Sequence, residues 1–260
     1  EDWMGSGNKE HAFAHDNVDW ENSYCVANNT HIKTLVLEDI ESVPKSFVNF
    51  CHGMTKNNSI ESIGITTGVH EKTMILLAPF IKRNHNLRSL YIGGEFCTMK
   101  AKNFSSLAST LSHGQSNLKS ITITCKLSDR SSGVLITSFA HCHSLSEITL
   151  CNGYIKSHGS AALAHFLKKS SCNIRKLNLQ NEKIDNKGLV IIADALAANT
   201  SLKVLNLGYN VAITSRCWMK FFNALVDSSL ALEELYLSSN SIEDSAIAAL
   251  GHVLIDMHSL

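Results

Sequence analysis

The residues best suited to chemistry are few and scattered. His141, Cys142 and His143 form the densest group of possible metal ligands in the 260-residue chain. A zinc site needs side chains that converge on one point, whereas three consecutive residues on a helix or turn point in different directions. We therefore interpret this group as a polar helix end with a buried cysteine. His11 and His15 have the i, i+4 spacing of a shared helix face, and we interpret them as part of a solvated terminal segment.

Motifs that carry catalysis are missing from the sequence. The chain contains no GxxxxGK[ST] phosphate loop, no GxSxG nucleophile elbow and no HExxH zinc motif. Lys+Arg and Asp+Glu are both 23, so the formal net charge is zero. This balance argues against nucleic acid and against a membrane as partner, because both attract a basic field. We predict no enzymatic activity, no cofactor and no metal, with a nucleotide bound only through a domain outside this chain.

The cysteine pattern indicates the compartment. The eight cysteines are spread singly, with no CxxC pair, which is typical of small buried side chains in a reduced protein. No apolar run approaches the roughly 18 to 20 residues that cross a bilayer, and nothing resembles a signal peptide. We expect a cytoplasmic protein. The chain begins without Met and stops on an apolar residue, and we expect both ends to be cut from something longer.

One pattern, apolar-x-x-apolar-x-apolar, recurs along most of the chain. It defines eight units that begin at residues 32, 60, 87, 118, 145, 174, 202 and 232, with separations of 28, 27, 31, 27, 29, 28 and 30. Leu260 falls 28 residues after the last start and is expected to begin a ninth unit. A nearly constant period of this length is the signature of a repeat architecture.

Each unit changes its hydrophobic period along its length. The first part alternates and predicts a short strand, and the eight strands are expected to centre near Leu35, Ile63, Leu90, Ile121, Ile148, Leu177, Leu205 and Leu235. A polar turn follows, and then apolar residues three or four apart, which predict an amphipathic helix. Such a unit buries its apolar face only when it is stacked on its neighbours.

The segments "LKVLNLGYN" and "LEELYLSSNSIEDSAIAALGHVL" resemble leucine-rich repeats of the ribonuclease-inhibitor-like subclass. The resemblance covers residues 32–260 and implies an α/β fold, a right-handed β-α solenoid (horseshoe) with a parallel concave sheet and convex helices. It also implies Asn or Cys at the ninth position of each unit, where a side-chain amide satisfies backbone groups. Asn210 and Asn240 meet this expectation, whereas the other units depart from it with Ile40, Gly68, Glu95, Lys126, Gly153 and Glu182. Residues 1–31 fit no repeat, and we interpret them as an N-terminal linker or the remnant of a cap.

A binding surface is expected on the concave sheet, because strand alternation sends every second side chain to solvent. The exposed positions of units one to four are mostly small residues, interrupted by Tyr91. Units five to eight add charges, amides and aromatic side chains, and tyrosine is a common anchor at protein interfaces. The predicted contact residues are Tyr91, Glu147, Lys176, Asn178, Asn206, Tyr209, Glu234 and Tyr236.

Three functions fit a repeat array of this kind. The repeats resemble the C-terminal arrays of NOD-like receptors, which implies a ligand-sensing or autoregulatory region of a larger receptor in innate immunity. A GTPase activator of the Ran-activating type uses the same repeats, and only Arg130 and Arg216 lie in or near turns where such an activator needs polar contacts. A substrate-receptor array of a ubiquitin ligase requires an F-box, for which residues 1–31 are too short. We favour protein binding on the concave face.

Overall fold

The computed structural model describes residues 11–14, 23–38, 45–66, 71–94, 101–113, 117–226, 228 and 230–256. Strands and helices alternate along the chain in these ranges. The strands are β1 His11–Ala14, β2 Thr34–Leu37, β3 Ser62–Ile65, β4 Ser89–Ile92, β5 Ser120–Ile123, β6 Glu147–Leu150, β7 Lys176–Asn178, β8 Val204–Asn206 and β9 Glu234–Tyr236. The helices are α1 Ser23–Asn28, α2 Lys45–Met54, α3 Glu71–Arg83, α4 Ala101–His113, α5 Asp129–Phe139, α6 Ser157–Leu167, α7 Asn186–Leu196, α8 Ser215–Val226 and α9 Asp244–Asp256.

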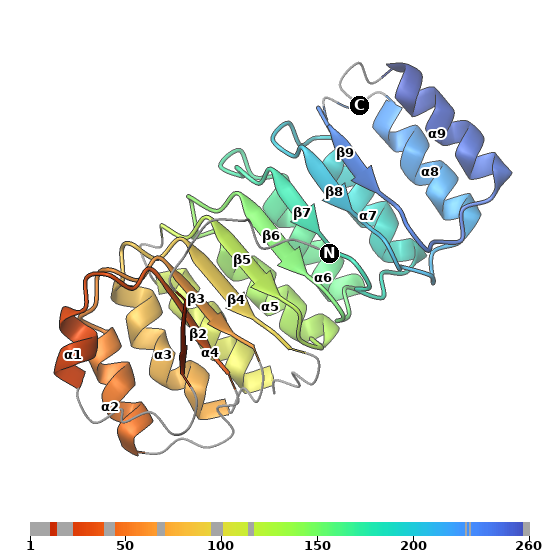
Figure 1. Ribbon diagram of the computed structural model, residues 1–260. Coiled ribbons are helices and arrows are strands. Elements are labelled where there is room, and N and C mark those ends of the chain that lie inside the picture. The colour runs from red at the N-terminus through yellow and green to blue at the C-terminus, as the bar shows by residue number, and fades with distance from the viewer. Residues whose placement is uncertain are drawn as a thin grey trace.

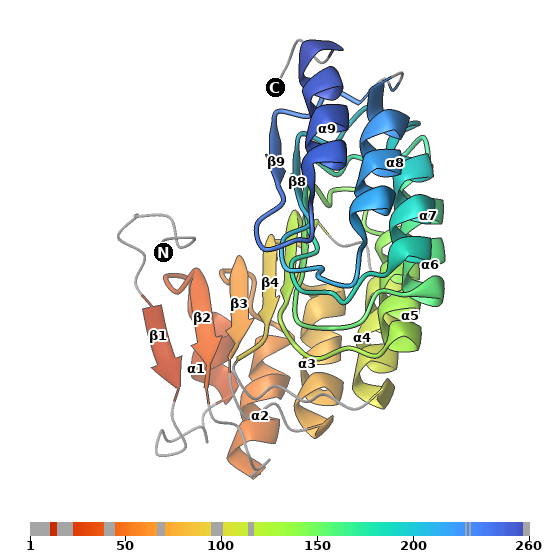
Figure 2. The same ribbon diagram turned by 90° about the vertical axis from the view of Figure 1, so that its right-hand side faces the viewer.

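The strands form one parallel sheet in the order of the sequence, β1 to β9. Figure 1 shows the sheet as a continuous ribbon of short strands with the helices behind it, and Figure 2 shows strands on the inner side of an open arc and helices on the outer side. Connecting neighbouring parallel strands through a helix is the β-α-β arrangement, which is nearly always right-handed. The predicted β-α solenoid, with a parallel concave sheet and convex helices, is therefore confirmed.

The strand register matches the repeat starts without a slip. The eight residues predicted as strand centres pair in an unbroken row, from Leu35 opposite Ile63 to Leu205 opposite Leu235. One strand was not expected. β1 pairs with β2 in the same parallel sense, and with α1 it places a strand and a helix in the range interpreted as a linker or cap remnant. His11, interpreted from the sequence as part of a solvated terminal segment, lies in this strand; His15 and Leu260 lie outside the described residues.

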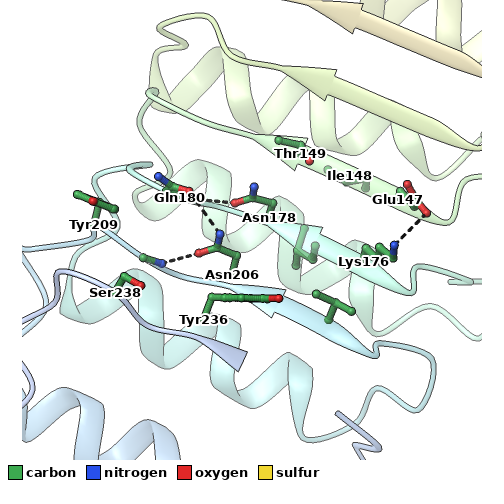
Figure 3. Close-up of a pocket in the computed structure, with 13 residues that line it drawn as sticks. Glu147, Ile148, Thr149, Lys176, Asn178, Gln180, Asn206, Tyr209, Tyr236 and Ser238 are labelled. Carbon is green, nitrogen blue, oxygen red and sulfur yellow. Dashed lines mark hydrogen bonds and ion pairs between the residues drawn. The ribbon is translucent and has the colours of Figure 1, made fainter. Parts of the chain in front are cut away.

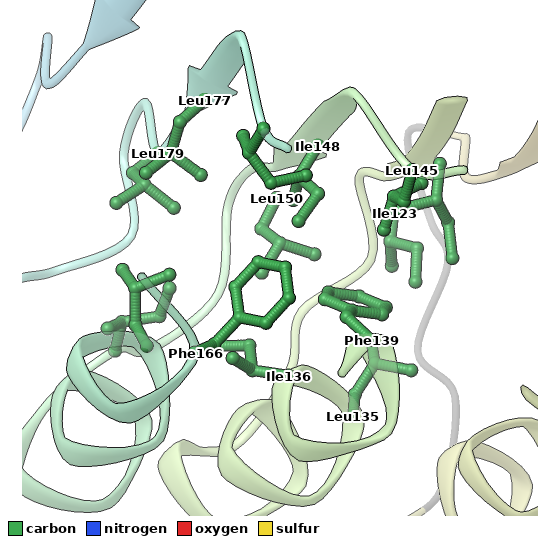
Figure 4. Close-up of a cluster of buried hydrophobic side chains, with 14 of the residues drawn as sticks. Ile123, Leu135, Ile136, Phe139, Leu145, Ile148, Leu150, Phe166, Leu177 and Leu179 are labelled. Carbon is green, nitrogen blue, oxygen red and sulfur yellow. The ribbon is translucent and has the colours of Figure 1, made fainter. Parts of the chain in front are cut away.

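The core lies between the sheet and the helices and runs the length of the array. The inward strand residues and the apolar helix positions are buried together. Figure 4 shows Phe139 and Phe166 from neighbouring helices packing under Ile148 and Leu150, with the two rings edge to face at 6.4 Å between centroids. Since each unit buries its apolar face against the next, stability is shared between neighbours.

Two sets of polar side chains tie consecutive units together. At the helix-to-strand junction, buried Asn57, Asn84 and Asn199 each donate to a carbonyl of the preceding unit and accept from backbone N–H groups of their own turn. Leaving such buried backbone groups unpaired costs free energy. The repeat pattern predicts side-chain bonds to the backbone only at the ninth position of each unit. It does not predict these asparagines, which lie three residues before the start of the next repeat.

The second set caps helices across the unit boundary. Asp129, the first residue of α5, accepts hydrogen bonds from the backbone N–H groups of Lys156, His158 and Gly159 at the start of α6. The Oδ1 atom of Asn186 accepts likewise from Thr214 ahead of α8. Capping normally comes from the helix's own first residues, so here each cap also fixes the distance between two repeats.

Candidate functional site: a pocket on the concave face

A pocket with a volume of about 270 Å³ lies on the concave face over β6 to β9; we call it the concave pocket. Val204 on β8 lines its floor together with Ile148 and Leu177, whose side chains are buried in the core, and its polar walls come from the strands and the turns that follow them. The remaining lining residues are Glu147, Thr149, Lys176, Asn178, Gln180, Asn206, Gly208, Tyr209, Tyr236 and Ser238. Small-molecule sites usually occupy about 300–1,000 Å³, so this pocket has room for one side chain of a larger partner.

Two tyrosines of the pocket are exposed to solvent. The residues Tyr209 and Tyr236 are 47% and 44% exposed, although most large apolar side chains of the array are buried. The Tyr236 hydroxyl donates to Glu234 at 2.6 Å, and this hydrogen bond raises the pKa of the phenol above its usual value. Because the bond fixes the direction of the hydroxyl, the Tyr236 ring is held in one orientation before any partner arrives.

Tyr209 has a backbone conformation that tyrosine rarely adopts. Its φ is 61°, in the left-handed region, where a side chain with a β-carbon crowds the following carbonyl. The equivalent eighth positions of units five, six and eight are Asn152, Asn181 and Ser239, all with positive φ. Asparagine tolerates this conformation best among residues other than glycine. The turn therefore imposes the left-handed backbone, and unit seven has a bulky tyrosine at this position.

Amide side chains form a connected row between neighbouring units. The backbone N–H of Gln180 donates to Asn178 Oδ1 at 3.0 Å, and that of Gly208 donates to Asn206 Oδ1 at 2.9 Å. The Asn206 Nδ2 atom donates to Gln180 Oε1 at 3.4 Å, as the dashed lines in Figure 3 show. Each oxygen that accepts a backbone N–H identifies which end of its amide is the oxygen.

Charged side chains pair across neighbouring strands. Lys176 Nζ lies 3.8 Å from Glu147 Oε1 inside the pocket, and Lys203 Nζ lies 3.0 Å from Glu233 Oε1 outside it. Both pairs are solvent-exposed, so each contributes little to stability.

Most of the predicted contact residues meet in this pocket. Glu147, Lys176, Asn178, Asn206, Tyr209 and Tyr236 line it, and Glu234 touches it through the Tyr236 hydroxyl. Tyr91 does not join them, because it lies on β4 with its hydroxyl 3.4 Å from Thr124 Oγ1.

The lining residues that the sequence analysis did not name include Gln180, Gly208 and Ser238. All three are seventh positions of their units, two residues beyond the last exposed strand residue. Strand alternation extended by one step into the turn would have found them.

The ninth position behaves differently from unit to unit. The Asn210 Nδ2 atom donates to the carbonyls of Leu179, Leu207 and Gly208, and Asn240 Nδ2 donates to those of Leu207 and Leu237. These asparagines join consecutive turns beside the pocket. In unit six the position is Glu182, which is completely buried, with its Oε1 accepting from Gly153 N at 3.2 Å. Its Oε2 atom has no hydrogen-bond partner among the described residues.

Burial dominates the protonation state of Glu182. It raises the pKa of this carboxyl to about 8, against a lowering effect of the Gly153 hydrogen bond. The carboxyl is therefore mostly protonated at neutral pH. Burial, together with the charge of Glu182, also raises the pKa of the nearby Cys151 thiol to about 12, so Cys151 is not a thiolate nucleophile near neutral pH.

The candidate metal group does not form a site. Cys142 is buried, whereas His141 and His143 are exposed after the end of α5, and no cluster of three possible ligands occurs in the described ranges. Six of the described cysteines form no disulfide bond: Cys25, Cys51, Cys142, Cys151, Cys172 and Cys217. Cys125 is disulfide-bonded, which departs from the expectation of reduced cysteines throughout.

Among the described residues, no helix has the length and hydropathy to cross a membrane.

A single parallel sheet of repeated strand–turn–helix units, with helices on one face and an exposed pocket on the other, defines a leucine-rich-repeat solenoid. A family model described as "Leucine Rich repeat" matches residues 198–216 and 230–251, which belong to units seven and eight. Units seven and eight are thus similar to leucine-rich repeats in sequence, and the described array has the leucine-rich-repeat fold.

Its repeats resemble those of NOD-like receptors. Over 157 residues the chain is 25% identical to the mouse (Mus musculus) NACHT, LRR and PYD domains-containing protein 14, covering 60% of this chain and 16% of that protein. Over 105 residues it is 30% identical to the human (Homo sapiens) protein of the same name, covering 40% and 10%. The chain therefore spans a small part of the length of these relatives.

A solved structure with a related outline is the Rad7 and Elc1 complex in yeast. It has 15% identity and a TM-score of 0.49, covering 92% of this chain and 64% of that chain. Strand order and register define the fold.

Proposed function

We propose that this chain binds a protein ligand on the concave face of units five to eight, as the ligand-sensing or autoregulatory region of a larger cytoplasmic NOD-like receptor. Leucine-rich-repeat arrays present extended concave surfaces to protein partners. The observation that carries the proposal is the concave pocket, where exposed Tyr209 and Tyr236 flank oriented amides. Rigid aromatic side chains beside adaptable polar groups are characteristic of interface centres.

The parent protein and its compartment are inferred from the relatives and the cysteines. The matched relatives carry NACHT and PYD domains by name, and a nucleotide would be bound only by such a domain outside this chain. Most described cysteines are free, which suits the cytoplasm. Arg130 and Arg216, the residues considered for a GTPase activator, lie in the first turns of α5 and α8, away from the residues that line the concave pocket.

Site-specific photo-crosslinking tests the location. A photoreactive amino acid is introduced at Ser238, beside the pocket, or at the exposed Val190 on the helical face. We expect a specific protein to be captured from Ser238 and not from Val190. Capture from Val190 alone would place the working surface on the helices and contradict the proposal.

The captured protein then serves as the ligand in binding measurements. Truncating a tyrosine at an interface centre typically costs about 2 kcal/mol or more, so Tyr209→Ala and Tyr236→Ala are each expected to weaken binding at least roughly tenfold. Their thermal stability should change little, because both side chains are largely exposed. Val190→Ala is the matched control on the other face and should bind normally.

A further inference from the structure

A groove with a volume of about 700 Å³ lies on the convex face between α3 and α4; we call it the convex groove. The two helices pack against each other on the outer side of the arc, as Figure 2 shows. One end of the groove is apolar and the other end is basic. Ile75 and Pro79 line it within α3, whereas Lys82, Arg83, His85 and His113 line it where the two helices end.

The apolar end of the convex groove is open to solvent. Ile75 is 55% exposed, and Pro79 is exposed as well. A single exposed apolar side chain is common on protein surfaces. These two residues are four apart in α3 and therefore lie on the same helix face, where they form one apolar wall beside a helix of the next unit.

The basic end of the groove is not balanced by a carboxylate of the described residues. Lys82 and Arg83 are exposed, and neither takes part in an ion pair with the described part of the chain. None of the described residues that line the groove is acidic. Glu61 already pairs with Lys33 at 3.3 Å, and Glu71 is the first residue of α3, at the opposite end of that helix.

The helix dipole does not by itself require this concentration of charge. Cations are favoured near the C-terminus of a helix, yet α5, α7 and α8 have no basic residue in their last turns. Residues 45–126 contain ten Lys and Arg but three Asp and Glu, although the formal net charge of the whole chain is zero. The excess of positive charge is therefore local to the stretch that contains the convex groove.

We propose that the convex groove binds an acidic segment of a protein partner. An apolar side chain of that segment packs against Ile75 and Pro79, and carboxylates beside it pair with Lys82 and Arg83. Hydrogen bonds from these cations to a carboxylate are stronger than those between neutral groups. Nucleic acid matches the groove less well, because a phosphate backbone attracts cations along its whole path and the groove has them at one end.

A synthetic peptide tests the convex groove without knowledge of the partner. A short capped peptide with a central leucine flanked by glutamates is labelled with a fluorophore and titrated into the 260-residue chain. Fluorescence anisotropy gives the affinity, and nuclear magnetic resonance locates the backbone amides that shift. We expect saturable binding that added salt weakens, with shifts in the last turns of α3 and α4. Shifts confined to other units, or no binding, would overturn the proposal.

Two control peptides separate the charged contact from the apolar one. In the first, glutamine replaces every glutamate, and in the second, alanine replaces the leucine. Both should bind more weakly than the parent peptide. Equal binding by the glutamine peptide would mean that the groove does not recognise acidic side chains.

Variants of the protein assign the contact to the two ends of the groove. Loss of one exposed charge pair weakens binding by roughly two- to fivefold, so Lys82→Gln combined with Arg83→Gln should weaken it by about tenfold. Ile75→Ala should weaken binding of the leucine peptide by at least about threefold and should not change binding of the alanine peptide. An unchanged affinity for the leucine peptide in either variant would contradict the proposal.

Matched controls lie elsewhere on the convex face. Lys168→Gln removes a cation that already pairs with Asp194 at the C-cap of α6, and Val190→Ala removes an exposed apolar side chain from α7. Both variants should bind the peptide normally.

Competition identifies the class of partner. Unlabelled peptide, a single-stranded DNA oligonucleotide and vesicles of anionic lipid are each added to the bound peptide. Stronger displacement by the oligonucleotide or the vesicles than by unlabelled peptide would assign the groove to nucleic acid or lipid and refute a protein partner. The convex groove is separate from the concave pocket, so capture of a partner from Ser238 tests the proposed function independently of these measurements.

Discussion

At the scale of single residues, most side chains of the array stabilise the fold, whereas Tyr209 adds backbone strain to it. Tyr209 is held in the left-handed region with φ 61°, where a residue other than glycine costs about 1–2 kcal/mol. Backbone strain of this kind persists at sites where it has a use. Because the Tyr209 side chain is exposed, its burial contributes little free energy to offset the strain.

Tyr209→Asn should therefore stabilise the protein and damage the site. Asparagine occupies the equivalent positions 152 and 181, and the substitution is expected to raise the free energy of unfolding by about 0.5–1 kcal/mol. Urea unfolding measures the increase in the free energy of unfolding. Titration with the captured partner measures the expected loss of binding affinity. A variant that is less stable than the parent would show that Tyr209 contributes packing that its exposure does not reveal.

Glu182 gives the fold a dependence on pH. Its pKa is raised to about 8 in the folded state, whereas an unfolded glutamate titrates near about 4.3. Between these values the unfolded state loses the proton and the folded state keeps it. The stabilisation is complete below the unfolded pKa and is lost as pH rises toward 8, with a slope of at most about 1.4 kcal/mol per pH unit.

Glu182→Gln should flatten this slope, because glutamine does not titrate. Unfolding free energies of parent and variant are compared between pH 5 and pH 8.5 (roughly the window bounded by the two pKa values), and the comparison uses the slopes, since the new amide also changes packing against Gly153. Parallel slopes would mean that Glu182 is ionised in the folded protein.

At the scale of helices and strands, each unit is completed by its neighbour. The first helix residue of one unit caps the next helix, as Asp129 does for α6, where Lys156 at the N-cap position makes no side-chain cap bond. Partial burial acts to raise the pKa of Asp129, but hydrogen bonds from Gly159, His158 and Lys156 outweigh it and lower the pKa.

Asp129→Ala is expected to cost about 0.5–2 kcal/mol, the usual range for a lost cap. Because the folded pKa is lowered, the carboxylate's contribution is present above the unfolded pKa and is lost as pH falls through the folded pKa. The difference between parent and variant in urea unfolding should thus narrow in acid. Asp129→Asn keeps an acceptor and should lose less; an equal loss in both variants would assign the effect to charge instead of capping.

At the scale of the whole molecule, each repeat contacts mainly its nearest neighbours. A destabilising substitution in one repeat should therefore affect that repeat and its neighbours only. Leu205 is fully buried in β8, and Leu205→Ala should cost about 2–5 kcal/mol. Hydrogen exchange is expected to rise in α7, β8 and α8, while amides of β3 and β4 keep their protection. A uniform rise would indicate a single cooperative unit. Leu235 is the equivalent residue of β9 and is only partly buried, so Leu235→Ala should cost less.

The sequence predicted the architecture well because a period of 27–31 residues fixes both strand spacing and burial. Leu177 and Ile148 are paired neighbours by repeat position alone. The site was predicted less completely. Gln180 and Ser238 lie in turns, where the alternation rule was not applied, and Asn178 was named as a contact without the direction of its amide. That direction depends on a backbone hydrogen bond, which no pattern of residue types reveals.

The unbroken register of the sheet gives equivalent positions on its concave face a constant spacing. Parallel strands are about 4.8 Å apart, so equivalent positions of units five to eight recur at that interval. An extended peptide laid across the strands repeats its side chains about every 6.6 Å on one face and is out of step by the second strand. An α-helix laid the same way advances about 5.4 Å per turn, and over three intervals it drifts by only about 2 Å. Four consecutive helical turns can therefore each meet one repeat of the concave face.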